Sequence, residues 1–145
     1  MEIRMRKLFS GSIVLALLLC ASLAMAASYG PAGAKFSIKA PAGWTESAMD
    51  GGVQVTNGKS ALVLQVVENG GMTPAAFGDE VAKAAGLSDV QKEVDGDLVN
   101  INGKKDGTPI QLIISKLDDK FVLSAVLSGP DTEDMQKIIQ SMQDE

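Results

Sequence analysis

Residues 110–128 read IQLIISKLDDKFVLSAVLS and contain two apolar runs on either side of an Asp-Asp pair. Each run has the length of a β-strand, and Asp118-Asp119 is typical of a turn. The stretch therefore predicts a β-hairpin over Ile110–Lys116 and Lys120–Ser128, and with it an antiparallel sheet. In the second run, alternate residues share one face of the strand: Phe121, Leu123, Ala125 and Leu127.

Further strands are predicted upstream of this hairpin. Ala61–Val67 (ALVLQVV) is a continuous apolar run, typical of a central strand covered on both faces. Asn57-Gly58 favours a tight turn before it, because both residues tolerate positive φ. The remaining predicted strands are Lys35–Ala40, which alternates and ends at Pro41, Val53–Thr56, Val90–Val94, and Leu98–Asn102 with a turn at Asn102-Gly103 or Asp106-Gly107.

Two helices complete the pattern. Thr73 is a good N-cap, Pro74 suits the first helical position, and Gly86 is typical of the residue after a helix. The apolar stripe of this helix is Phe77, Val81 and Ala84 or Ala85. Pro130-Asp131 opens a final helix with its own stripe of Met135, Ile138, Ile139 and Met142. The expected fold class is α+β, an antiparallel sheet of about six or seven strands with helices packed on it.

The N-terminal residues resemble a cleavable signal peptide. Arg4, Arg6 and Lys7 precede the apolar segment of residues 13–20, and Ala24-Met25-Ala26 has the small-x-small pattern of a cleavage site. We therefore expect a signal peptide at 1–26, a short leader at 27–34, a single domain at 35–145, and a periplasmic or secreted protein. The alternatives are an uncleaved anchor, for which the apolar run is short, and a lipoprotein acylated at Cys20, which follows the large Leu19.

The composition of residues 27–145 excludes several chemistries. This part of the chain has no His, Cys or Arg, and ten lysines against 17 aspartates and glutamates, a difference of −7. Triads built on Ser-His-Asp or Cys-His are impossible without imidazole. An acidic chain without arginine is also a poor match for nucleic acid or anionic membrane. We expect no cofactor, no transmembrane segment after signal cleavage, and a protein or small ligand as the partner.

Two groups of residues are candidate sites. Asp95, Asp97 and Asn100 form the densest group of oxygen donors, but Val99 and the lack of a following glycine break the EF-hand calcium pattern. A hairpin turn with solvated polar ends is the simpler interpretation of these residues. Trp44, the single tryptophan, either lines a ligand groove with Tyr29 or seats the first loop against the sheet.

The stretch Phe36-Ser37-Ile38-Lys39-Ala40-Pro41-Ala42-Gly43-Trp44 resembles the opener F-x-[IV]-x-x-P-x-G-W of small exported proteins with the PsbP-like α/β/α sandwich. The resemblance implies an antiparallel sheet between helices and a role as a non-catalytic accessory or binding module. It transfers no ligand residue. The expected function is therefore a non-enzymatic exported binding module of the cell envelope. The alternative is a carboxylate-only enzyme or a calcium-dependent module that uses Asp95 and Asp97.

Overall fold

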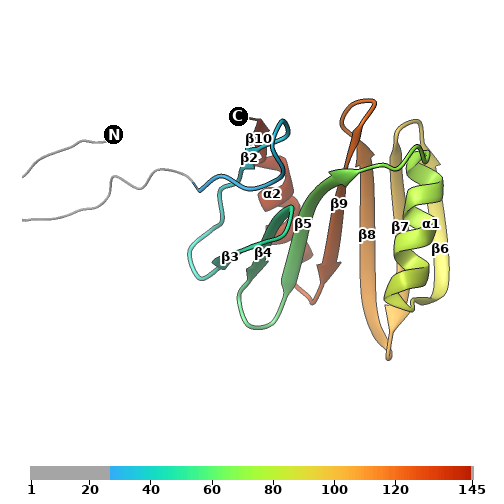
Figure 1. Cartoon of the computed structure of the whole chain (residues 1–145). Helices are drawn as coiled ribbons and strands as arrows, with labels where there is room; N and C mark the ends of the chain where they lie inside the picture. The colour runs from blue at the N-terminus through green and yellow to red at the C-terminus, as the bar shows by residue number, and fades with distance from the viewer. Residues whose placement is uncertain (1–26, 145) are drawn as a thin grey trace, which may run out of the picture.

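The computed structural model describes residues 27–144, and its main feature is a seven-stranded antiparallel sheet (Figure 1). The strands lie in the order β3-β4-β5-β9-β8-β7-β6, so the predicted α+β class with an antiparallel sheet is confirmed. The predicted signal peptide at 1–26 lies outside the described residues. The strand bounds are Thr45–Met49 (β3), Gly52–Thr56 (β4), Ala61–Glu68 (β5), Ser88–Asp95 (β6), Leu98–Lys105 (β7), Thr108–Lys116 (β8) and Phe121–Ser128 (β9).

The hairpin of β8 and β9 forms at the predicted turn. Asp118 Oδ1 accepts hydrogen bonds of 2.8 Å from the backbone amides of both Lys120 and Phe121, which closes the tip. The turn between β7 and β8 uses Asp106-Gly107, whose φ angles of 52° and 82° are both positive, as a type I′ hairpin turn requires. Gly103, the other predicted turn residue, is buried inside β7 and pairs with Ile110.

Two segments near the N-terminus differ from the prediction. The strand expected over Lys35–Ala40 shrinks to β2 (Phe36–Ser37), which pairs with β10 (Gln143–Asp144) as a separate two-stranded sheet. Phe36 and Ile38 are buried as the alternation predicts, because this segment packs over the main sheet instead of extending it. The edge strand β3 was not predicted, because all five of its residues are exposed and lack an apolar alternation.

Helix α1 (Pro74–Ala85) has the predicted ends. Thr73 is the N-cap, and its Oγ1 accepts the amide of Ala76 at 3.2 Å. Gly86 ends the helix in the left-handed conformation with φ of 72°. The buried residues are Gly78 and Ala82, whereas Phe77, Val81 and Ala85 are half-buried and Ala84 is exposed. Because small residues face the sheet, the helix packs closely on β7 and β8.

Helix α2 (Thr132–Gln140) follows β9 directly. Asp131 is its N-cap residue but makes no side-chain capping bond. Its carboxylate instead accepts hydrogen bonds from Ser60 Oγ at 2.8 Å and Asn57 Nδ2 at 3.0 Å, in the turn between β4 and β5. Met135 and Ile138 are completely buried, as the predicted stripe requires, while Ile139 and Met142 are half-buried at its side.

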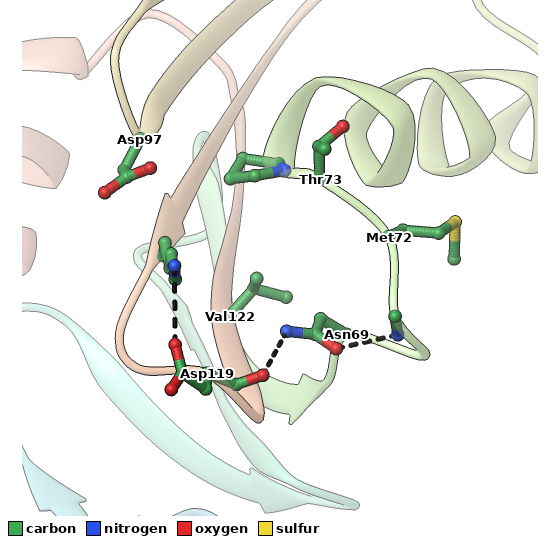
Figure 2. Close-up of a pocket in the computed structure, with 9 residues that line it drawn as sticks. Asn69, Met72, Thr73, Asp97, Asp119 and Val122 are labelled. Atoms are coloured by element: carbon green, nitrogen blue, oxygen red, sulfur yellow. Dashed lines mark hydrogen bonds and ion pairs between the residues drawn. The ribbon is translucent and has the colours of Figure 1, made fainter.

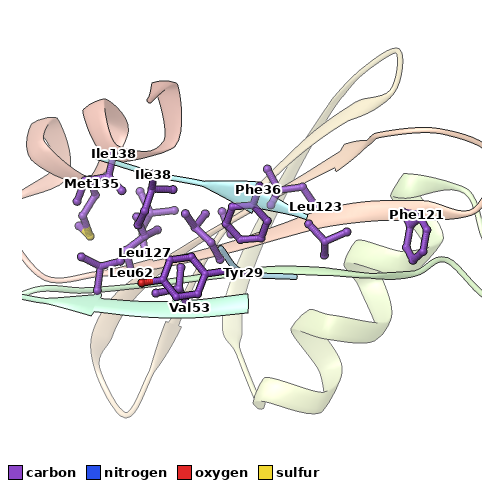
Figure 3. Packing of buried hydrophobic residues seen from close by; sticks show 14 residues of the cluster. Tyr29, Phe36, Ile38, Val53, Leu62, Phe121, Leu123, Leu127, Met135 and Ile138 are labelled. Atoms are coloured by element: carbon purple, nitrogen blue, oxygen red, sulfur yellow. The ribbon is translucent and has the colours of Figure 1, made fainter. Parts of the chain in front are cut away.

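The two helices lie on opposite faces of the sheet and cover different halves of it (Figure 1). Figure 3 shows the first core, in which α2, Tyr29 and Phe36 pack against β4, β5 and β9. The second core lies between α1 and one face of β7 and β8, with Val122 of β9. Part of each sheet face therefore carries no helix, and the residues of both edge strands are exposed.

Candidate functional site

Four connections meet at one end of the sheet, which we call the acidic end. Since neighbouring strands run in opposite directions, alternate turns lie at the same end, as the pairs Met49↔Gly52, Glu68↔Phe121, Asp95↔Leu98 and Lys116↔Val122 show. These connections carry two lysines, Lys116 and Lys120. They also carry six acidic residues: Asp50, Glu68, Asp95, Asp97, Asp118 and Asp119. The excess of carboxylates makes this end attractive to cations.

A pocket of about 280 Å³ opens at the acidic end. Figure 2 shows its walls: the loop before α1, with Asn69, Met72 and Thr73, the turn residue Asp97, and Asp119 with Val122 from the β8–β9 hairpin. These three segments are far apart in the sequence. The pocket therefore exists only in the folded chain.

Asn69 holds two walls of this pocket together. Its Nδ2 donates to the carbonyl of Asp119 at 2.9 Å, and its backbone amide donates to the carbonyl of Lys120 at 2.8 Å. Its Oδ1 accepts the amide of Gly71 at 2.8 Å, which fixes the loop before α1. The pocket is thus preformed, and a bound group would not have to order the loop first.

The polar groups of the pocket suit a cation better than an anion. Lys116 Nζ lies 3.6 Å from Asp119 Oδ1, but the Asp119 side chain is fully exposed, and Asp97 adds a second exposed carboxylate. The start of α1 offers little to an anion, since Pro74 has no amide hydrogen and the Ala76 amide already donates to Thr73. A basic side chain of a partner fits this balance of charge.

Hydrogen bonds lower the pKa of one acidic-end carboxyl group. The pKa of Asp118 lies below its ordinary value because the amides of Phe121 and Lys120 donate to it, with a smaller effect of nearby lysines. Asp118 is therefore a structural anion that closes the hairpin tip. This is the opposite of the raised pKa that a general acid needs.

The structure separates the predicted metal candidates. Asp97 lines the pocket on the α1 side, whereas Asp95 and Asn100 lie on the sheet face opposite α1, as their pairing with Leu98 and Glu93 shows. Asn100 Oδ1 accepts from Gln111 Nε2 at 3.1 Å. Within residues 27–144, no group of three or more acidic, His or Cys side chains is placed to hold a metal ion.

The other predicted pair, Tyr29 and Trp44, belongs to the packing of the first core. Tyr29 is only 7% exposed, and its ring centroid lies 6.0 Å from that of Phe36. Its hydroxyl donates to Glu46 Oε1 at 2.6 Å. Trp44 is half-buried against the same core. Neither residue lines the pocket at the acidic end, and Tyr29 is too buried to offer its ring to a ligand in a groove.

Exposed apolar side chains gather around the same end, which the sequence did not predict. Met49, Met72, Leu98 and Leu117 are all more than a third exposed and lie in or beside its turns. None of these four residues belongs to a periodic apolar pattern in the sequence. Whether each one is exposed therefore depends on how the turns come together in the fold. Acidic and aliphatic groups thus lie at the same end of the sheet. Within residues 27–144, no helix is long and apolar enough to span a membrane.

Comparisons with known proteins assign no family to this chain. No protein-family model matches the chain, and no curated protein matches it. A solved structure of a protein from Bacteroides thetaiotaomicron is similar over 76% of this chain, with 11% identity and a TM-score of 0.49. The chain spans 45% of that protein's length.

Proposed function

We propose that this chain is an exported, non-enzymatic accessory or binding module of the cell envelope, with a PsbP-like architecture, that binds a basic partner protein at its acidic end. The export pattern at 1–26 and the opener Phe36–Trp44 support the first part of the proposal. An antiparallel sheet with one helix on each face is compatible with the PsbP-like sandwich.

The meeting of carboxylates and exposed aliphatic side chains at one end of the sheet carries the second part. Rims of charge around apolar contacts are typical of protein interfaces, in which electrostatic complementarity sets the rate and the specificity of association. Six acidic residues against two lysines favour a partner that presents Lys or Arg. Met72 and Leu117 add exposed apolar area at the same end of the sheet.

The chemistry of the chain supports binding over catalysis. Residues 27–145 contain no imidazole, thiol or guanidinium, so proton transfer near neutral pH would depend on carboxylates and lysines. The pocket carboxylates Asp97 and Asp119 are exposed on turns. A carboxylate pair acting as acid and base needs one member in an environment that raises its pKa.

A capture experiment with charge-matched variants tests the proposal. The wild-type domain, an Asp97→Asn/Asp119→Asn variant, and an Asp106→Asn/Glu133→Gln control at the opposite end are immobilised and exposed to envelope extract. Both variants lose the same charge. We expect the wild type and the control to retain the same basic protein in a salt-sensitive manner, and the acidic-end variant to retain several-fold less. Equal retention by both variants would contradict the proposal.

A further inference from the structure

Strand β6 presents an open edge of the sheet. It is the last strand in the order (Figure 1) and pairs only with β7. All eight of its residues are exposed. On such a strand every second residue directs its backbone N–H and C=O groups away from the sheet, where they form a template for another strand. A bulge between Ser88 and Gln91 limits the regular part to Gln91–Asp95.

The two faces of this edge differ in chemistry. Val94, which pairs with Val99, lies on the face toward α1 and is 53% exposed. Val90 lies in the bulge and is 45% exposed, and both are among the most exposed large apolar residues of the described chain. The opposite face carries Gln91, Glu93 and Asp95, which pair with Asn102, Asn100 and Leu98 of β7. The edge therefore combines aliphatic contacts on one side with carboxylates on the other.

The single lysine of β6 is already paired. Lys92 Nζ lies 3.0 Å from both carboxylate oxygens of Asp79 on α1. Within residues 27–144, the carboxylates of Asp89, Glu93 and Asp95 make no ion pair. The charge that the edge offers to a newcomer is consequently negative.

This charge pattern disfavours a second copy of the chain as the occupant. Two β6 strands paired antiparallel about Lys92 would place Lys92 opposite Lys92. Shifting the centre to Glu93 places Glu93 opposite Glu93, and shifting it to Val94 places Glu93 opposite Asp95. Like charges directly opposite each other destabilise a strand pair. The same carboxylates attract a strand of opposite charge.

We propose that β6 is a docking edge to which an extended segment of a basic protein adds as an eighth strand. The segment would place Lys or Arg opposite Glu93 and Asp95 and an aliphatic residue opposite Val94, while its backbone bonds to the open edge. This inference rests on the proposed function, because it states how the basic partner docks. Since β6 ends at the acidic end, one partner can contact both surfaces.

A labelled peptide tests this docking mode directly. The probe is a peptide of alternating lysine and valine, and its matched control has the same sequence with alternate backbone amides N-methylated. The control keeps every charge but cannot complete the ladder. We expect the methylated peptide to bind at least about tenfold more weakly, and the unmodified peptide to protect the amides of Gln91–Asp95 from hydrogen exchange.

Variants of the protein give an independent readout. Glu93→Lys should weaken binding of the unmodified peptide by about tenfold, whereas Glu80→Lys, the same charge change at an exposed position of α1, should change it less than about threefold. Far-UV circular dichroism melts of both variants control for folding. Equal binding of the two peptides, equal effects of the two variants, or protection elsewhere would overturn the docking edge. None of these outcomes affects the capture at the acidic end, which uses Asp97 and Asp119.

Discussion

Tyr29 Oη donates a 2.6 Å hydrogen bond to Glu46 Oε1 and so joins the segment before the domain to the edge strand β3, 17 residues later. Tyr29 also pairs through its backbone with Phe36, at 2.9 Å in both directions. Residues 27–34, predicted as a leader, therefore take part in the first core through Tyr29. The single tyrosine of the chain also makes this contact measurable.

Tyr29 should make stability pH-dependent in the alkaline range. Burial, then the hydrogen bond and charge of Glu46, raise the pKa of Tyr29 from 10.0 to about 12. Between these values the unfolded chain loses the phenolic proton while the folded chain keeps it, so the stabilisation is complete below pH 10 and is lost toward about pH 12. Tyr29→Phe should be less stable by about 1 kcal/mol at neutral pH, and its difference from wild type should shrink across this window.

Urea unfolding at a series of pH values measures the difference, and tyrosinate absorbance gives the pKa itself. Glu46→Gln is the control, because it retains an acceptor oxygen and removes the charge. Since burial is the largest cause, the pKa of Tyr29 should stay raised in this variant, though less than in wild type. Titration of the wild-type tyrosine near its ordinary value would show that the hydroxyl is not held by Glu46.

Two glycines without positive φ should respond differently to a methyl group. A Cβ at Gly52 would overlap the carbonyl oxygen of Leu64 in the neighbouring strand, and backbone atoms cannot move aside cheaply. A Cβ at Gly78 would lie 2.9 Å from Ile101 Cδ1, the far end of a flexible side chain. Gly52→Ala should therefore cost about 1–3 kcal/mol or more. For Gly78→Ala, alanine's gain in helix propensity of about 1 kcal/mol should offset the contact.

Chemical denaturation of both variants beside wild type decides this prediction. Gly78→Ala should be about as stable as wild type, and Gly52→Ala should be clearly less stable than both. If the two variants unfold at the same urea concentration, the close approach of β4 and β5 at Gly52 is not as the structure describes.

The bond between Ser60 and Asp131 should hold α2 against the sheet. Ser60 is almost fully buried, donates to Asp131 Oδ2 at 2.8 Å and accepts the Asp131 amide at 3.0 Å. Ser60→Ala should cost about 1–2 kcal/mol, because it leaves that amide without its partner. Ser47→Ala, on the exposed edge strand β3, is the matched control and should change stability by less than about 0.5 kcal/mol.

At acidic pH, Ser60→Ala should reduce the stability of the domain by a smaller amount than at neutral pH. Hydrogen bonds from Asn57 and then Ser60 lower the pKa of Asp131 in the folded chain. Because the pKa of Asp131 is lower in the folded chain than its unfolded value of about 3.9, the ionised carboxylate stabilises the fold above that pH. This stabilisation is lost as the pH falls further. Urea unfolding at neutral pH and near pH 3 should show a smaller difference between Ser60→Ala and wild type in acid. If the stability difference between Ser60→Ala and wild type were the same at both pH values, the pKa of Asp131 would not depend on its contact with Ser60.

Export remains a prediction from the N-terminal sequence. Mass spectrometry of protein recovered from the envelope fraction should give an N-terminus at Ala27, because the cleavage pattern ends at Ala26. An Ala24→Leu/Ala26→Leu variant, which removes both small residues, should accumulate as the uncleaved precursor. Recovery of the wild type in the membrane with a lipid on Cys20 would replace this assignment with the lipoprotein alternative.

The elements that the sequence determined by itself are those whose signals are local. Thr73, Pro74 and Gly86 marked both ends of α1, because capping and the left-handed conformation depend on the residue and its immediate neighbours. The β8–β9 hairpin and the stripe of Met135 and Ile138 followed from turn chemistry and periodicity. Composition alone also removed imidazole, thiol and guanidinium chemistry from residues 27–145.

Only the tertiary structure decided which distant segments meet. The pairing of Phe36 with Asp144, the edge position of β6 and the gathering of turns at the acidic end all depend on strand order, which residue spacing does not encode. β3 carries no apolar pattern because its residues face water on a sheet edge, so nothing in its composition marked it as a strand. The carboxylates of the candidate site lie on exposed residues in or beside turns, where side chains need no burial pattern. Their charges gather only when the folded chain brings those turns together.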